Sequence, residues 1–149
     1  MYMRFRDNKS KVLTLSYDDG MVQDIRLIDI MNKHGLKGTF NLNSGLYMPE
    51  DQERERFYGK LKLSEAKSLY TNSGHEVAVH GYKHQFLHRL KSVDAINEIL
   101  EDRKAIESDY GIIARGMAYS YGAYNDEIIQ LLKNVEFVIQ ELLIQPSGS

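Results

Sequence analysis

The chain has 149 residues, enough for one domain with a buried core, and the 42% hydrophobic and 27% charged residues fit a globular protein. It contains no cysteine, which excludes disulfides, thiolate metal ligands and a cysteine nucleophile. The formal net charge is -2 without a basic cluster, and no run approaches the roughly 20 apolar residues that cross a bilayer, so we expect neither a nucleic acid nor a membrane as partner.

The N-terminal half alternates signals for strands and helices. The first ten residues are polar, and because they are too polar for a secretory signal peptide we expect a cytoplasmic protein. Apolar Val12, Leu13 and Leu15 predict a buried strand over about 12–16. Five further elements are predicted after it: a helix over 22–34, a strand over 38–42, a charged loop over 43–59, a helix over 64–72 that Ser64 opens, and a strand over about 76–79.

The C-terminal half continues the same alternation. The longest helix is predicted to begin at Ser92, and its buried face is expected to be the apolar stripe Val93, Ile96, Ile99, Leu100, Ile106 and Tyr110. The charged residues of this helix are expected on its other faces, among them Asp94, Glu98, Glu101 and Asp102. Three elements follow: a strand over 116–119, a helix capped by Asn125, and a fifth strand over 135–139.

Strands and helices thus alternate in units of about 30 residues, which predicts a single α/β domain with parallel strands and right-handed crossovers. In such folds, active and binding sites lie beyond the C-terminal ends of the strands. Chemically active residues are therefore expected directly after the predicted strands.

Two adjacent carboxylates, Asp18 and Asp19, follow the first predicted strand and precede Gly20. Their charges repel, and desolvation disfavours the ionised forms, so the pair is poorly placed for stability. The position makes sense if a cation or a substrate proton uses the two acids. The alternative interpretation is an ordinary Asp-Asp-Gly surface turn.

Two histidines, His80 and His84, follow the third predicted strand at a spacing of four residues. Two imidazoles at this spacing can reach one metal ion, on a helix face or across a tight turn. A carboxylate from Asp18 or Asp19 would complete a site of two histidines and one acid with positions open for water. Spacing alone does not decide between the two aspartates, and two exposed histidines at this spacing also arise by chance.

Taken in order, these segments resemble the motifs of the polysaccharide deacetylases, the NodB-like carbohydrate esterases of family 4. Residues 14–20 resemble the Thr-Phe-Asp-Asp-Gly motif of that family, and residues 37–40 resemble its Ala-Thr-Phe. Residues 80–84 resemble its His-x3-His motif, and 118–122 resemble its Arg-x-Pro-Tyr-Gly. The resemblance covers about 12–134 of the chain.

The resemblance implies an incomplete or distorted (β/α) barrel that removes acetyl groups from a carbohydrate, with the N-acetyl group of an amino sugar favoured. It implies that Asp19, His80 and His84 hold a divalent metal ion, zinc foremost. Asp18 is then the general base, and the backbone N–H of Tyr121 stabilises the oxyanion. The expected partner is an acetylated carbohydrate.

The chain departs from the family pattern at several positions. Ala118 replaces the usual arginine and Ser120 the usual proline, so Arg115 is the remaining candidate partner for Asp18. No counterpart of the later motifs, which include a general-acid histidine, follows before Ser149, so the domain is expected to be C-terminally truncated. The alternatives are a catalytically weak or inactive metal- or sugar-binding remnant of the family, or a purely structural domain.

The predicted strand over 135–139 is the last in the chain, and it would leave an edge with unpaired backbone groups. The following segment 141–147 is apolar for a terminus. Edges of this kind pair with another chain unless they are covered, so we expect a homo-oligomer, in the simplest case a two-fold dimer. The alternative is a marginally stable fragment with an exposed core.

Overall fold

The computed structural model describes residues 8, 10–53, 59–134 and 138–139. Five parallel strands form one sheet, and each pairs with the strand that follows it in the chain. The strands are β1 (Ser16–Asp18), β2 (Thr39–Leu42), β3 (Glu76–Val79), β4 (Gly116–Met117) and β5 (Val138–Ile139). Within the described residues β1 and β5 are the outer strands, so the barrel is incomplete, as the sequence predicted.

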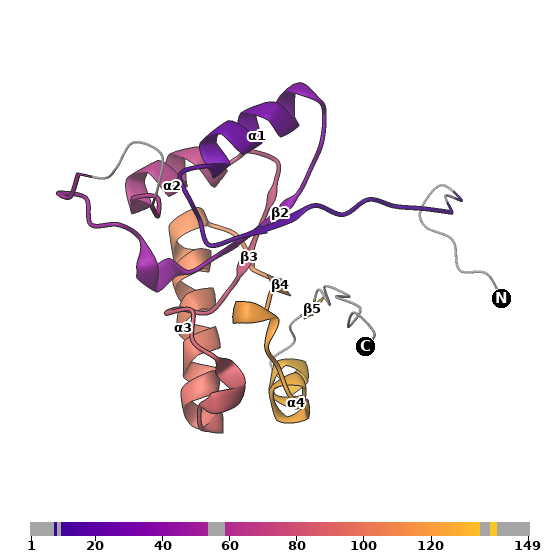
Figure 1. Cartoon of the computed structure of the whole chain (residues 1–149), viewed down its shortest axis with the longest axis vertical. Coiled ribbons are helices and arrows are strands. Elements are labelled where there is room, and N and C mark those ends of the chain that lie inside the picture. Colours follow the sequence, from indigo (N-terminus) through magenta and orange to yellow (C-terminus); the bar gives the residue numbers. More distant parts are fainter. Residues whose placement is uncertain (1–7, 9, 54–58, 135–137, 140–149) are drawn as a thin grey trace, which may run out of the picture.

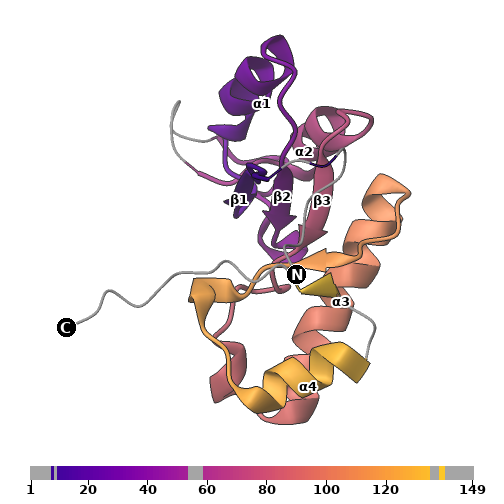
Figure 2. The ribbon, with the colours of Figure 1, turned by 90° about the vertical axis from the view of Figure 1, so that its right-hand side faces the viewer.

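One α-helix lies in each connection between consecutive strands, which confirms the predicted alternation. The helices are α1 (Asp24–Lys33), α2 (Leu63–Tyr70), α3 (Ser92–Tyr110) and α4 (Asp126–Asn134). Figures 1 and 2 both place α1 next to α2 and α4 next to α3. None of the helices in the described ranges has both the length and the apolar character needed to cross a membrane.

The core lies where these helices cover the central strands. All four residues of β2 are buried, and so are the last three of β3, as is typical of parallel strands covered on both faces. Each helix contributes apolar side chains to this core: Ile28 and Met31 from α1, Ala66 and Tyr70 from α2, Ile99 and Ile106 from α3, and Ile128 and Leu132 from α4.

The first strand lies further along the chain than predicted. Val12 is 58% exposed and Leu13 is 76% exposed, so neither belongs to a buried strand. Parallel pairing begins only where β2 offers a partner, with the N–H of Thr39 donating to the carbonyl of Leu15 at 2.9 Å. Apolar character suggested the strand, but the position of β2 decides where the strand starts. As a result Asp18 is itself the last residue of β1.

The buried face of α3 also differs from the predicted apolar stripe. Val93 is 68% exposed, and Leu100 is exposed as well. Glu98 and Asp102, both expected on other faces, are buried. Their carboxylates accept hydrogen bonds from the backbone of the loops that carry the candidate site, and these bonds compensate the charges for the loss of water.

The remaining boundaries differ by smaller amounts. Ser92 and Ser64 are not caps, because α3 begins at Ser92 itself and α2 begins one residue before Ser64. Asn125 does cap α4, since its side-chain oxygen accepts the N–H of Ile128 at 2.9 Å. The fourth strand is shorter than predicted, and residues 135–137 of the fifth and the segment 141–147 lie outside the described residues.

Candidate active site

The connections that follow β1, β2, β3 and β4 all begin at the same end of the sheet. Asp18 ends β1 and Asp19 follows it, Asn43 follows β2, His80 follows β3, and Ala118 follows β4. Because the strands are parallel, their C-terminal ends all lie at this end of the sheet. The order of strands in the sheet therefore brings together residues that are up to about a hundred positions apart in the chain.

Unusual backbone conformations shape the loops at the C-terminal end of the sheet. Five non-glycine residues in the described ranges have positive φ, which is uncommon although Asn, Asp and His adopt it more often than other types: Asn8, Asn72, Asp19, His84 and Tyr121. The φ values of the last three are 82°, 53° and 61°. Strained backbone of this kind clusters at functional sites, where the surrounding structure holds it in place. All three residues belong to the candidate site.

Asp19, His80 and His84 form a compact group of possible metal ligands, with one ligand atom from each within 4.8 Å of the others. The Nε2 atoms of the two histidines are 3.2 Å apart, and Nε2 of His84 is 3.5 Å from Oδ1 of Asp19. Asp18 lies at the same place, with its Oδ2 3.9 Å from Nε2 of His80. The two acids predicted after the first strand and the two histidines predicted after the third strand are thus neighbours in space.

The orientation of His80 fits metal binding. Its Nδ1 lies 2.9 Å from the carbonyl oxygen of Ala118, and because a carbonyl only accepts, Nδ1 carries the proton in the neutral ring. The lone pair is then on Nε2, the atom that faces His84. A histidine ligand commonly donates its second ring N–H in this way, which fixes both the tautomer and the ring.

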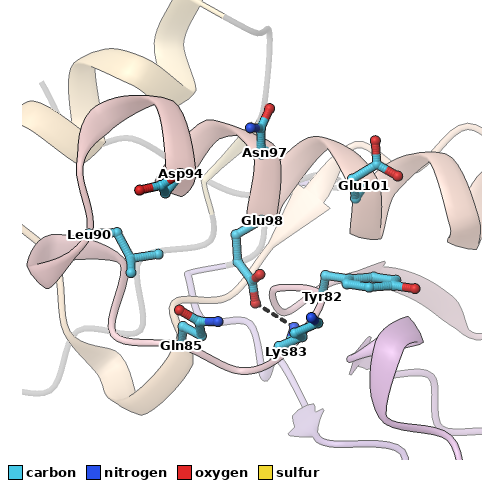
Figure 3. A pocket seen from close by; sticks show the side chains of 8 residues that line it. All are labelled: Tyr82, Lys83, Gln85, Leu90, Asp94, Asn97, Glu98 and Glu101. Carbon is cyan, nitrogen blue, oxygen red and sulfur yellow. Dashed lines mark hydrogen bonds between the residues drawn. The ribbon is translucent and has the colours of Figure 1, made fainter.

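Two buried acids of α3 hold the backbone of residues 80–84, the histidine loop, which follows β3. Asp102 accepts hydrogen bonds from the N–H of His80 at 3.0 Å and from the N–H and hydroxyl of Ser44 at 2.7 and 2.5 Å. Burial raises the pKa of Asp102 to about 6. Figure 3 shows Glu98 reaching from α3 toward the backbone N–H of Lys83, beside a hollow of about 460 Å³.

Sequence reasoning placed these two acids on the wrong faces of α3, although a signal was present. Asp102 stands at helical spacing between Ile99 and Ile106, in the middle of the apolar stripe. An acid at such a position is either an error in the stripe or a buried group with hydrogen-bond donors around it. Here it is the second, and the donors belong to the site.

Asp18 is held by an amide. The side-chain N–H₂ of Asn41, the register partner of Asp18 on β2, donates to Oδ1 of Asp18 at 2.7 Å and to the hydroxyl of Ser16 at 2.8 Å. Arg115, the partner suggested by the sequence, is exposed. It precedes β4 and so lies at the N-terminal end of the strands, opposite the site. The described part of the chain shows no ion pair between Arg115 and Asp18.

Asp19 has a lysine as its partner, which sequence reasoning did not find. Nζ of Lys60 donates to the carbonyl of Asp19 at 2.6 Å, to its Oδ1 at 3.1 Å and to Oδ1 of Asn43 at 2.9 Å. Burial raises the pKa of Asp19, but the hydrogen bond and charge of Lys60, with smaller contributions from His84 and His80, outweigh it, so the pKa lies below its ordinary value. Lys60 follows the charged loop that the sequence predicted to be a solvated insertion.

Tyr121 lies on the turn after β4, next to the histidines. Its ring stacks on Phe86 with centroids 3.9 Å apart and meets the ring of His84 at 4.3 Å. Burial lowers the pKa of His84, while the charge of Asp19 acts in the opposite direction. The lowered pKa favours the neutral form of His84, which is the form that binds a metal.

Comparison with known proteins identifies the same family that the sequence motifs resemble. The family described as polysaccharide deacetylase matches residues 5–139. Among curated proteins, the peptidoglycan-N-acetylglucosamine deacetylase PgdA of Listeria monocytogenes serotype 1/2a is 25% identical over 125 residues, which cover 81% of this chain and 24% of that protein. The chain thus spans about a quarter of the length of the curated relatives it matches.

Solved structures share the fold at lower identity. The Streptococcus pyogenes deacetylase PplD, solved in complex with acetate, superposes with a TM-score of 0.73 at 22% identity, covering 85% of this chain and 54% of that one. A pseudoenzyme of carbohydrate esterase family 4 from Bacillus anthracis superposes with a TM-score of 0.69 at 19% identity, covering 87% and 42% of the two chains. The same fold therefore occurs in an enzyme and in a protein described as a pseudoenzyme.

Proposed function

The chain belongs to the polysaccharide deacetylase family, the NodB-like carbohydrate esterases of family 4, and from this premise we propose that it is a metal-dependent hydrolase that removes acetyl groups from a carbohydrate. The N-acetyl group of an amino sugar is the favoured substrate, in keeping with the name of the curated relative. The observation that carries the proposal is the group of Asp19, His80 and His84, whose ligand atoms converge within 4.8 Å.

The donor set supports a borderline-soft divalent ion, and we propose zinc. Two imidazole nitrogens and one carboxylate oxygen are the ligands of many catalytic zinc sites, which keep a further position open. His80 presents Nε2 with its lone pair, because its Nδ1–H is bonded to Ala118. When bound, such an ion polarises an acetyl carbonyl and lowers the pKa of a coordinated water.

The side chains around the ligands have separate roles in this proposal. Asp18 is the general base that takes a proton from the attacking water, and Asn41 holds its carboxylate in position through Oδ1. Oδ2 of Asp18 remains on the side of His80, 3.9 Å from Nε2. The backbone N–H of Tyr121 stabilises the negative charge that develops on the acetyl oxygen.

Metal content and acetate release test the proposal together. We expect the purified chain to bind one equivalent of zinc and to release acetate from N-acetylglucosamine oligomers. His80→Ala and His84→Ala should each weaken zinc binding by more than about tenfold, because each removes a ligand. His34→Ala, at the exposed end of α1, is the matched control and should bind zinc as the parent chain does. Failure of the parent chain to bind any divalent ion would refute the proposal.

A second candidate is a catalytically weak or inactive member of the family that binds metal or sugar. Two features favour it: the ammonium group of Lys60 contacts the carboxylate of Asp19, and Ala118 replaces the usual arginine. Zinc binding without acetate release from any acetylated oligosaccharide, whether N- or O-acetylated, would select this candidate over the first.

A further inference from the structure

Lys60 is a charged residue that contacts a candidate ligand and that the proposed chemistry does not use. The segment that carries it is fixed, because Lys60 forms an antiparallel bridge with Met21 and the N–H of Leu61 donates to the carbonyl of Gly20 at 2.9 Å. Its side chain is only 24% exposed, and its ammonium group contacts three oxygen atoms. The position of this cation is thus determined by the fold.

The contacts of Lys60 connect two of the loops that supply ligands. One side of its ammonium group binds Asp19, and the other binds the side-chain oxygen of Asn43. The amide nitrogen of Asn43 donates in turn to the carbonyls of His80 and Gly81, both at 2.9 Å. Asn43 is buried, so these bonds are protected from water. They fix Asp19 relative to the histidine loop.

The charge of Lys60 acts on the same atom that the metal would use. Oδ1 of Asp19 is 3.1 Å from Nζ of Lys60 and 3.5 Å from Nε2 of His84. An ammonium group at this oxygen neutralises part of its charge, and it repels a divalent ion that binds beside it. The same contact keeps the carboxylate oriented when no metal is bound, as outer partners of ligands do.

We propose that Lys60 is a positioning residue that stands in for part of the metal charge: it holds Asp19 in ligating position in the metal-free protein and lowers the affinity of the centre for a divalent ion. This inference rests on the proposed metal site. It predicts opposite changes in two properties: removing Lys60 should raise the affinity for the metal and lower the stability of the metal-free protein. A residue with a purely structural role would not raise the affinity.

The test is calorimetric titration of the metal-free full chain with zinc chloride, combined with thermal denaturation without metal. Lys60→Met should bind zinc about tenfold more tightly, because it removes a positive charge beside the ion, and should melt at a lower temperature when metal-free. Lys60→Arg keeps the charge and should bind zinc as the parent does. The matched control is Lys33→Met, which removes an exposed lysine paired with Asp29 and should change neither property.

The possible outcomes separate this inference from the proposed function. If the parent binds zinc and Lys60→Met binds it equally or more weakly, the inference is wrong and the metal site stands. If neither protein binds zinc, both are wrong. Should Lys60→Met not fold, Lys60→Gln retains a hydrogen-bond donor without the charge, and the same tightening is expected of it; unchanged or weaker binding by that variant would overturn the inference.

Discussion

Two neighbouring aspartates at one site have different partners in this protein. Asp18 ends a strand and receives a hydrogen bond from the neutral amide of Asn41, whereas Asp19 has positive φ and lies against the ammonium group of Lys60. The left-handed conformation of Asp19 turns its side chain from the opposite face of the strand to the site. The two adjacent aspartates are therefore held in different ways, which fits the separate roles proposed for them.

The difference between the two acids leads to a prediction for paired amide variants. Asp18→Asn should leave zinc affinity within about threefold of the parent, since Asp18 is not among the proposed ligands, and should reduce acetate release by at least about a hundredfold, because an amide cannot act as the proposed base. Asp19→Asn should lose zinc instead. Zinc titration and acetate release on both variants check this assignment. Loss of zinc from Asp18→Asn with retention by Asp19→Asn would reverse it.

At the scale of elements, most of the fold followed from the sequence, and the exceptions have physical causes. The strands β2 and β3 were placed to within about a residue, because glycines and loops of polar residues bound short apolar runs. The first strand was misplaced, because its start depends on where Thr39 begins to pair with Leu15. No local pattern contains that information.

The candidate site was predictable to a similar degree. The two histidines and two acids carry their signal in type and spacing, and they come together because the strands are parallel. Lys60 and Asn41 were missed, because a lysine in a charged segment and an asparagine in a strand carry no motif. Asp102 was missed although its place in the apolar stripe of α3 was a signal. Their importance comes only from the contacts that the fold creates.

Helix α3 provides a prediction about stability, through Asp102. Asp102→Asn should lower the free energy of unfolding by about 2 kcal/mol at pH 7, because the amide has one acceptor oxygen and its N–H₂ group would face the N–H donor of either Ser44 or His80. Burial raises the pKa of Asp102 from 3.8 to about 6 in the folded chain. Between these two values the folded state holds a proton that the unfolded state has lost, so the contribution of Asp102 to stability grows as pH falls through this window.

Urea denaturation of the parent and of Asp102→Asn at pH 7 and at pH 4.5 measures this effect. The parent should be the more stable protein at both values, and the difference between the two should be larger at pH 4.5. The comparison between the proteins cancels the titration of other groups. An equal or smaller difference at pH 4.5 would show that the pKa of Asp102 is not raised in the folded protein.

For the whole molecule, the open sheet leads to a prediction about assembly. In the described residues β1 pairs only with β2 and β5 only with β4, so each is an outer strand of the sheet. Outer strands carry backbone donors and acceptors that pair with another chain unless something covers them. We predict that the chain self-associates, most simply as a two-fold dimer. Sedimentation equilibrium should give a mass near twice the 17.2 kDa of one chain, and a monomer at all concentrations would contradict the prediction.

The sheet order has a consequence for how the protein is made. Because neighbouring strands are also consecutive in the chain, a ribosome releases them in the order in which they pair. Asp19, Lys60, His80 and His84 emerge before α3 is complete, so a nascent chain that stops short of residue 102 already has every candidate ligand. It still lacks the carboxylate that holds the N–H of His80. The candidate ligands are thus synthesised before one of the buried acids that hold the histidine loop.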